Sequence, residues 1–187
     1  SGNVLLEAIG ATTDVTANAD VVSGSGHISV LAARSVEFTA NADVTTSATG
    51  TIDVEAGAGS LTLSTTSNQS TGSGDIRLLA AADITLGGVS TTTGNLSATA
   101  TAGTIYDGDG DGSVDIAANG LRLFAGTGIG QLGASVNPIE TTVTTVSARA
   151  AGGGISLRET NGLVVDDTGA TVQRVKVDAG VTATVDA

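Results

Sequence analysis

The sequence predicts an all-β fold in which short strands stack in successive turns, a β-solenoid of about 20–25 residues per turn. Two series of apolar pairs, each with one residue between its members, support this fold. The first series is Val4/Leu6, Ile28/Val30, Ile52/Val54 and Ile76/Leu78, at steps of 24 residues. The second is Thr13/Val15, Val36/Phe38, Leu61/Leu63 and Ile84/Leu86, at steps of 23, 25 and 23 residues. Two interleaved strand series that share one period are typical of repeats that pack on their neighbours.

The composition agrees with a stacked β core. The chain has 27 Gly and one Pro, no Cys, Met or Trp, and only 2% aromatic residues. Val, Ile, Leu, Ala and Thr must therefore fill the interior, and these residues fit a pleated, stacked surface. Apolar residues make up 40% of the chain and are regularly spaced, so we do not expect a disordered protein.

The chain is strongly acidic. Its 19 acidic and 7 basic residues give a net charge of −12. Such a chain lacks the basic surface that nucleic-acid binding needs, and an anionic lipid surface would repel it. The balance suits cation binding and an extracellular protein. Without Cys there is neither a disulfide framework nor thiol chemistry, and no apolar stretch is long enough for membrane insertion.

We expect one β-solenoid segment over residues 1–187, with regular turns in residues 1–103 and looser turns with longer loops in residues 104–187. Alternation places the paired apolar residues inward and their neighbours outward, and Gly or Asn at the corners would supply positive φ. At a strand spacing of about 4.8 Å, about eight turns would form a rod roughly 40 Å long. Because Ser1 opens within a repeat and no Met precedes it, we interpret the chain as a segment of a longer repeat protein.

Strand pairs are still recognisable in the looser part. They are Val114/Ile116, Leu121/Leu123, Ile155/Leu157, Leu163/Val165 and Val175/Val177. In the regular part, the hexamer Thr-Ala-Asn-Ala-Asp-Val occurs at Thr16–Val21 and again at Thr39–Val44. If both copies occupy the same place in their turns, Asn18 and Asn41 stack and their amides can hydrogen-bond along the ladder.

Two stretches resemble a known family beyond this periodicity. The segment Gly74–Leu86 resembles the repeats of filamentous-haemagglutinin-type bacterial exoproteins. The segment Gly126–Val143 is similar to a module of giant bacterial surface proteins of that kind, and the similarity continues through Gly152–Leu157 and Asn161–Val165.

The resemblance implies a right-handed parallel β-helix that is secreted across a bacterial outer membrane and is extracellular or on the cell surface. It implies adhesive or scaffolding work, with no catalytic residue to carry over. The implied partners are neighbouring repeats of the same long chain, further copies of it, or a ligand on a host cell or cell envelope.

One local motif suggests a metal. Asp107, Asp109, Asp111 and Asp115 occupy positions 1, 3, 5 and 9 of a segment that has Gly at position 6. Hard carboxylate oxygens at this spacing are typical of the start of a calcium loop, so calcium is the candidate cofactor. Position 12 is Ala118 instead of the usual bidentate Glu. An exposed acidic turn is therefore the competing interpretation.

Two further patterns leave alternatives open. Asp20, Asp43 and Asp83 each precede a strand, and they could form a cation-binding ladder on one edge or serve as solvated turn residues. The Thr/Ser-rich stretches 44–50, 64–72 and 89–94 could form an ice-binding face, although Thr is also a good strand residue.

No enzyme is predicted. His27 is the only histidine and occupies an outward position at a strand end, so a His-based metal cluster or catalytic triad is not supported. The basic residues do not cluster in the sequence. The preferred function is a structural or adhesive segment that acts as a stiff scaffold, with calcium as the candidate stabiliser. The alternatives are a ligand- or ice-binding module on a β-solenoid and, less favoured, a polysaccharide-active enzyme.

Overall fold

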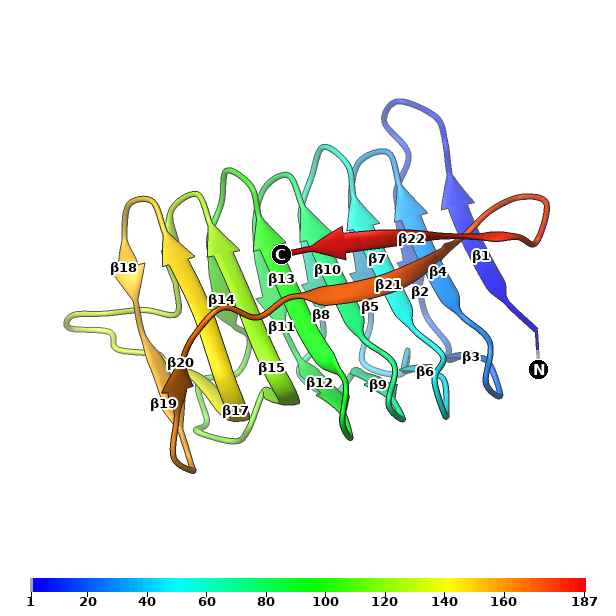
Figure 1. Cartoon of the computed structure of the whole chain (residues 1–187). Coiled ribbons are helices and arrows are strands. Elements are labelled where there is room, and N and C mark those ends of the chain that lie inside the picture. The colour runs from blue at the N-terminus through cyan, green and yellow to red at the C-terminus, as the bar shows by residue number, and fades with distance from the viewer. Residues whose placement is uncertain (1) are drawn as a thin grey trace.

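The computed structural model describes residues 2–187 as strands and turns arranged in a β-solenoid (Figure 1). Parallel strands stack through about six turns, which confirms the predicted all-β solenoid. Among these residues there is no helix, and so none long and apolar enough to cross a membrane. Ser1, where the sequence opens within a repeat, lies outside the described residues.

The largest sheet has thirteen strands and covers two faces of the solenoid. Strands β15 and β17 bend across a corner and pair on both faces: Ile116 of β15 lies opposite Thr141 of β17, and further along Leu121 lies opposite Val146. The strands of this sheet are β1 (Val4–Ala8), β3 (Val21–Val22), β4 (Ile28–Ala32), β6 (Val44–Thr45), β7 (Ile52–Ala56), β9 (Asn68–Thr71), β10 (Ile76–Ala80), β12 (Gly88–Thr91), β13 (Asn95–Ala100), β15 (Ile116–Ala125), β17 (Ile139–Ala150), β19 (Leu157–Glu159) and β20 (Val164–Val165).

A seven-stranded parallel sheet forms the remaining face. Its strands are β2 (Val15–Ala17), β5 (Val36–Phe38), β8 (Leu61–Leu63), β11 (Ile84–Leu86), β14 (Ile105–Asp107), β16 (Gly128–Ile129) and β18 (Gly154–Ile155). Each turn of the chain therefore adds one strand to every face, and residues one period apart lie side by side.

The first predicted series of apolar pairs is confirmed: Val4, Ile28, Ile52 and Ile76 are direct neighbours in successive turns. The second series is confirmed except at its start, where Val15 and not Thr13 aligns with Val36. Thr13 instead closes a turn, because its amide and its hydroxyl both donate to the Gly10 carbonyl oxygen.

The duplicated hexamer is only partly in register. Its last residues align, with Val21 opposite Val44, but Thr16 lies opposite Glu37 and not Thr39. The corner between the two strands is two residues longer in the second turn. The expected stacking of identical hexamers is therefore wrong at their start, because strand pairing decides the alignment.

The core is a column of buried, mostly small and branched apolar side chains. Ile52, Ile76 and Phe38 are fully buried, and so are Ile28 and Leu96, which stack on the two isoleucines. A continuous stack of β-branched and Leu side chains removes apolar surface from water in every turn, and this supplies the main stabilisation of the solenoid.

Glycines at one corner allow the turns to approach closely. A Cβ atom at Gly74 would lie 1.9 Å from the Gly50 carbonyl oxygen, and one at Gly26 would lie 2.3 Å from that of Gly2. These glycines do not have positive φ, contrary to the expectation for the corners. Glycine is needed at these positions because each lies against the backbone of the preceding turn, where a larger side chain would not fit.

The later turns are less regular, and some predicted inward residues face solvent. Ile116, Leu121 and Leu123 are buried as predicted. Ile155 and Val165, in contrast, are exposed. Loops 108–115 and 130–138 lengthen these turns and use residues that would otherwise build further ones. The solenoid therefore has about six turns, about 30 Å at strand spacing, and not the expected eight.

The chain does not continue as a solenoid to residue 187, which corrects the predicted boundary. Strands β21 (Ala170–Val175) and β22 (Val181–Asp186) form an antiparallel hairpin that crosses the outward faces of β4, β7, β10 and β13 (Figure 1). Val177, predicted as half of an inward pair, lies at the hairpin turn and is exposed. Val172 and Val175 are buried against the solenoid.

Backbone groups of the β21 segment bind side chains of four successive turns. The amides of Thr171, Gln173 and Val175 donate to Asp75 Oδ2, Thr51 Oγ1 and Ser29 Oγ at 2.7–2.9 Å. The Gly169 carbonyl oxygen accepts a hydrogen bond from Asn95. These alternate amides point away from β22, so the solenoid satisfies the free edge of the hairpin.

A buried ionic network lies beneath the hairpin. Asp53, which has no exposed surface, accepts hydrogen bonds from Arg77 at 2.8 Å and from Arg174 of the hairpin at 2.7 Å. Glu55 accepts from both arginines, and Asp186 bonds Arg77. Because Arg174 of the hairpin and Arg77 of the solenoid share Asp53 and Glu55, this network ties the hairpin to the solenoid.

Candidate metal centre

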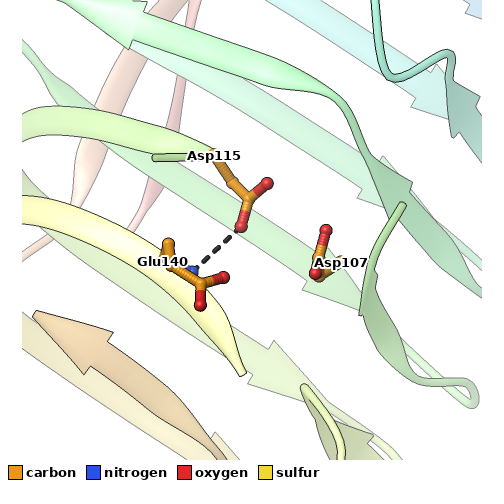
Figure 2. A group of neighbouring side chains, drawn as sticks. All are labelled: Asp107, Asp115 and Glu140. Carbon is orange, nitrogen blue, oxygen red and sulfur yellow. Dashed lines mark hydrogen bonds between the residues drawn. The ribbon is translucent and has the colours of Figure 1, made fainter. Parts of the chain in front are cut away.

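Three acidic side chains meet where two later turns stack. Asp107 ends β14, Asp115 immediately precedes β15, and Glu140 lies in β17 (Figure 2). Strand pairing places Asp115 beside Glu140: the Asp115 amide donates to the Glu140 carbonyl oxygen at 3.0 Å, and the Glu140 amide donates to Asp115 Oδ2 at 2.9 Å. The group therefore joins two adjacent turns of the solenoid.

The three carboxylates are close together and withdrawn from solvent. One oxygen atom of each lies within 4.8 Å of the other two. The exposed fractions of Asp107, Asp115 and Glu140 are 8%, 5% and 3%. Oxygens bound to one calcium ion at 2.3–2.6 Å lie no more than about 5 Å apart, so all three can reach a single ion.

The hydrogen bonds satisfy these carboxylates unequally. Asp107 accepts the amides of Asp109 and Gly110, each at 2.9 Å. The Glu140 carboxylate, within the described part of the chain, accepts no hydrogen bond from another residue. The nearest cationic group to it is the largely exposed Arg158 guanidinium, 3.8 Å from Glu140 Oε1. A largely buried carboxylate with few hydrogen-bond donors, beside two other carboxylates, is most favourably neutralised by a proton or a cation.

The pKa values reflect this concentration of negative charge. Burial raises the pKa of Asp115 to about 7, and the charges of Asp107 and Asp109 act in the same direction against the hydrogen bond from the Glu140 amide. Burial and the Asp107 charge also raise the pKa of Glu140, whereas Arg158 lowers it. The site therefore favours either bound protons or a bound cation at neutral pH.

The structure brings together only two of the four residues that the sequence motif suggested. Asp107 and Asp115 belong to the buried group, whereas Asp109 and Asp111 lie on the exposed loop between them. Asp109 and Asp111 each accept an amide two residues further on, at 3.1 Å and 2.6 Å. They shape the loop as turn residues do.

Glu140 was missed because it lies in a different segment of the sequence. A signal for it exists in the repeat: Glu140 follows Asp115 by 25 residues, close to the solenoid period. Residues one period apart become neighbours when turns stack. Because the loops of the later turns vary in length, the sequence does not show which residues of adjacent turns become neighbours. The motif was therefore interpreted only from residues that are close to each other in the sequence.

The three aspartates of the proposed ladder do not share one edge. Asp20 and Asp43 stack at one corner, whereas Asp83 lies at a different corner, before β11. Each carboxylate accepts a backbone amide from the next turn, donated by Asp43, Asn68 and Thr104 respectively. These side chains link successive turns, as solvated turn residues can.

Other residues singled out in the sequence also have structural roles. His27 is half-buried, and its Nδ1 lies 3.0 Å from Thr51 Oγ1 and 3.2 Å from the Thr51 amide. In the Thr/Ser-rich stretches, Thr46, Thr71 and Thr91 are buried and donate to glycine carbonyl oxygens. These threonines are therefore not part of an exposed flat surface.

The chain has no match among protein-family models, curated proteins or solved structures. The assignment as a β-solenoid therefore depends on the strand register described above.

Proposed function

We propose that this chain is a structural segment of a secreted bacterial surface protein or filament and acts as a stiff scaffold. The observation that carries the proposal is the parallel register, which runs from β1 to β17 with one strand of each turn beside the next. A rod of this kind resists bending because deformation would break backbone hydrogen bonds and core contacts in several turns together. The role is mechanical and not catalytic.

The hairpin and the turn-to-turn carboxylates support the same role. The segment 169–175 bonds four successive turns, and Asp20, Asp43 and Asp83 each bond an amide of the following turn. The resemblance to filamentous-haemagglutinin-type repeats agrees with an adhesive or scaffolding protein outside the cell. Its partners would be neighbouring repeats, further copies of the chain, or a surface ligand.

The proposal includes a calcium ion held by Asp107, Asp115 and Glu140. Three buried carboxylates suit a hard cation, and no other residue among 2–187 donates a hydrogen bond to the Glu140 carboxylate. Calcium takes six to eight oxygen ligands, so carbonyl groups or water would complete its shell. The ion would neutralise the group and hold two turns together where the loops make the solenoid irregular.

The test is a calcium titration of the whole chain, followed by thermal melting and negative-stain microscopy. Calcium at about 100 times its dissociation constant stabilises a protein by about 2.7 kcal/mol. For a chain of this size we expect a rise in Tm of about 5–10 °C. Glu140→Gln and Asp115→Asn should abolish the rise, whereas Asp109→Asn and Asp111→Asn, which remove the same charge, should keep it.

The outcomes separate the two parts of the proposal. A calcium response that Asp109→Asn abolishes and Glu140→Gln preserves would assign the ion to the loop and not to the buried group. Rods or fibres in the micrographs would support the filament. Strictly monomeric particles, with no lateral or end-to-end association at high concentration, would contradict self-assembly and favour a module that displays a binding site.

A further inference from the structure

A groove of about 610 Å³ lies on the outward face of β15 and β17. The hairpin covers the corresponding face of earlier turns, and the segment 167–168 that leads into it forms one wall of the groove. The residues that line the groove are Arg122, Leu123, Phe124, Ser147, Arg149, Asp167, Thr168 and Ala187. The groove is thus the uncovered continuation of the face that the hairpin occupies.

Two arginines in this groove have no ion-pair partner among residues 2–187. Of the seven basic residues, five have a carboxylate oxygen within 4.0 Å: Arg34, Arg77, Arg158, Arg174 and Lys176. Within residues 2–187, Arg122 and Arg149 have none, and both line the groove. In a chain of net charge −12, two unpaired guanidinium groups in one groove form a local site for an anion.

Neighbouring side chains hold both guanidinium groups in place. Arg149 lies opposite Phe124 across the β15–β17 ladder, and its guanidinium carbon is 5.5 Å from the centre of the ring. This is a cation–π distance. Arg122 donates to Thr99 Oγ1 at 3.3 Å. A partly fixed guanidinium loses less conformational freedom when it binds an anion.

The character of the groove indicates the kind of anion. Strand β15 is paired on both sides, by β13 and β17, so a ligand that lies over β15 meets side chains and no free strand edge. On its other side β17 pairs β20 only at Thr145 and Val146, so short polyglutamate, an extended acidic peptide, is the competitor that the test must include. Besides the arginines, the groove offers the hydroxyl groups of Ser147 and Thr168 and the ring of Phe124, which suit a ligand with hydroxyl groups and apolar C–H faces.

We propose that this groove binds an acidic saccharide, with Arg122 and Arg149 as the residues that bind its carboxylate. Each guanidinium can form two parallel hydrogen bonds with a carboxylate. Asp167 lies in the wall and repels an anion, so it limits the affinity. This binding role goes beyond the scaffold function and does not depend on the calcium site.

The test is calorimetric titration of the whole chain with trigalacturonate in a calcium-free buffer at low salt. We expect binding that weakens by about tenfold or more in Arg122→Gln and in Arg149→Gln, because each loses a charge-assisted pair of hydrogen bonds. Lys176→Gln removes the same charge at the hairpin turn and should not change binding. Asp167→Asn should strengthen binding. A neutral galactose trisaccharide should bind at least tenfold more weakly than trigalacturonate.

Several results would overturn the proposal. These are absence of binding, equal binding of the neutral saccharide, or unchanged binding in both arginine variants. Tighter binding of inorganic phosphate, or of a short polyglutamate, would replace the saccharide with that ligand. Melting curves of each variant verify that it folds. If Arg122→Gln is destabilised, the binding of Arg149→Gln decides the outcome, because Arg149 is exposed and its replacement should not affect folding.

Discussion

The turns up to β13 and the turns of β15 and β17 use the same columns in different ways. One outward column runs through Ser29, Asp53, Arg77, Ser97, Arg122 and Ser147. The hairpin buries its first four members, and there each charged group has a partner. The last two members are uncovered, and Arg122 has no ion-pair partner among the described residues. The environment of a column therefore depends on what lies over it.

The corners of the regular turns and of the later turns also differ in how their polar groups are paired. In the regular turns, glycines stack backbone against backbone, and single aspartates bond the next turn. In the later turns, loops 108–115 and 130–138 replace such corners, and Asp107, Asp115 and Glu140 gather between them. Regular stacking pairs most of its polar groups, with Gln69 Oε1 as an exception, whereas the irregular turns gather three carboxylates that can bind a ligand.

The largest effect should follow a charge placed in the buried column of the regular turns. Ile52→Asp puts a carboxylate in a fully buried position without hydrogen-bond donors, so we expect a loss of more than about 4 kcal/mol and disruption of several turns. Circular dichroism during thermal unfolding measures this loss. Val165→Asp, at an exposed position in a later turn, is the control and should melt like the parent protein. An unchanged cooperative transition in Ile52→Asp would contradict the inward assignment.

Loss of the buried ion network should separate the hairpin from the solenoid. Asp53→Ala leaves Arg77 and Arg174 without their shared buried partner, and we expect a destabilisation of about 3–5 kcal/mol. Hydrogen exchange should show faster exchange in β21 and β22, while the core strand β8 stays protected. Glu37→Ala removes an exposed carboxylate from β5 as a matched control. Equal loss of protection in β8 and the hairpin would mean that they unfold as one unit.

The corner glycines provide a smaller test of close stacking. In Gly74→Ala the added methyl group meets the Gly50 carbonyl oxygen, so we expect a destabilisation of about 1–3 kcal/mol. Gly162→Ala, in a later turn where the methyl group meets no atom within 4 Å, is the control. Denaturant unfolding compares the two variants, and equal stability would contradict the steric role of the corner.

The smallest effect concerns pH and the acidic group in metal-free protein. The folded pKa of Asp115 is about 7, whereas an Asp in an unfolded chain has a pKa of about 3.9. Between these values the folded state binds more protons, so this group stabilises the fold below about pH 4 and loses that contribution as the pH rises to about 7. Each kcal/mol lost lowers Tm by about 2–4 °C.

The Asp115→Asn variant isolates this contribution from that of other carboxylates. Paired groups such as Asp14, whose pKa the hydrogen bond from Arg34 lowers to about 2, have the opposite pH dependence. The difference in Tm between the parent protein and Asp115→Asn, followed from pH 4 to pH 8 with a chelator present, reports Asp115 together with its coupling to Asp107, Asp109 and Glu140. Asp107, Asp109, Glu140 and Arg158 surround the group in both proteins. A constant difference over this range would contradict the raised pKa.

The regular turns were predictable because their interactions are repeated at one period. Ile28, Ile52 and Ile76 have the spacing of stacked turns, and their strands pair in that register. The acidic group was predictable only in part, since Asp107 and Asp115 lie near each other in sequence and Glu140 does not. The hairpin was not recognised, because the alternation of β21 and β22 is that of any strand and does not specify the face on which it packs.

The sequence by itself determined the strand spacing, the apolar column and the acidic character of the chain, because these depend on local alternation and composition. Only the tertiary structure decided that the hairpin folds back across four turns and that Glu140 joins Asp115. It also decided that Arg122 and Arg149 share a groove. These contacts join residues from separate turns or from opposite ends of the chain, and their geometry depends on loop lengths and register that no local pattern specifies.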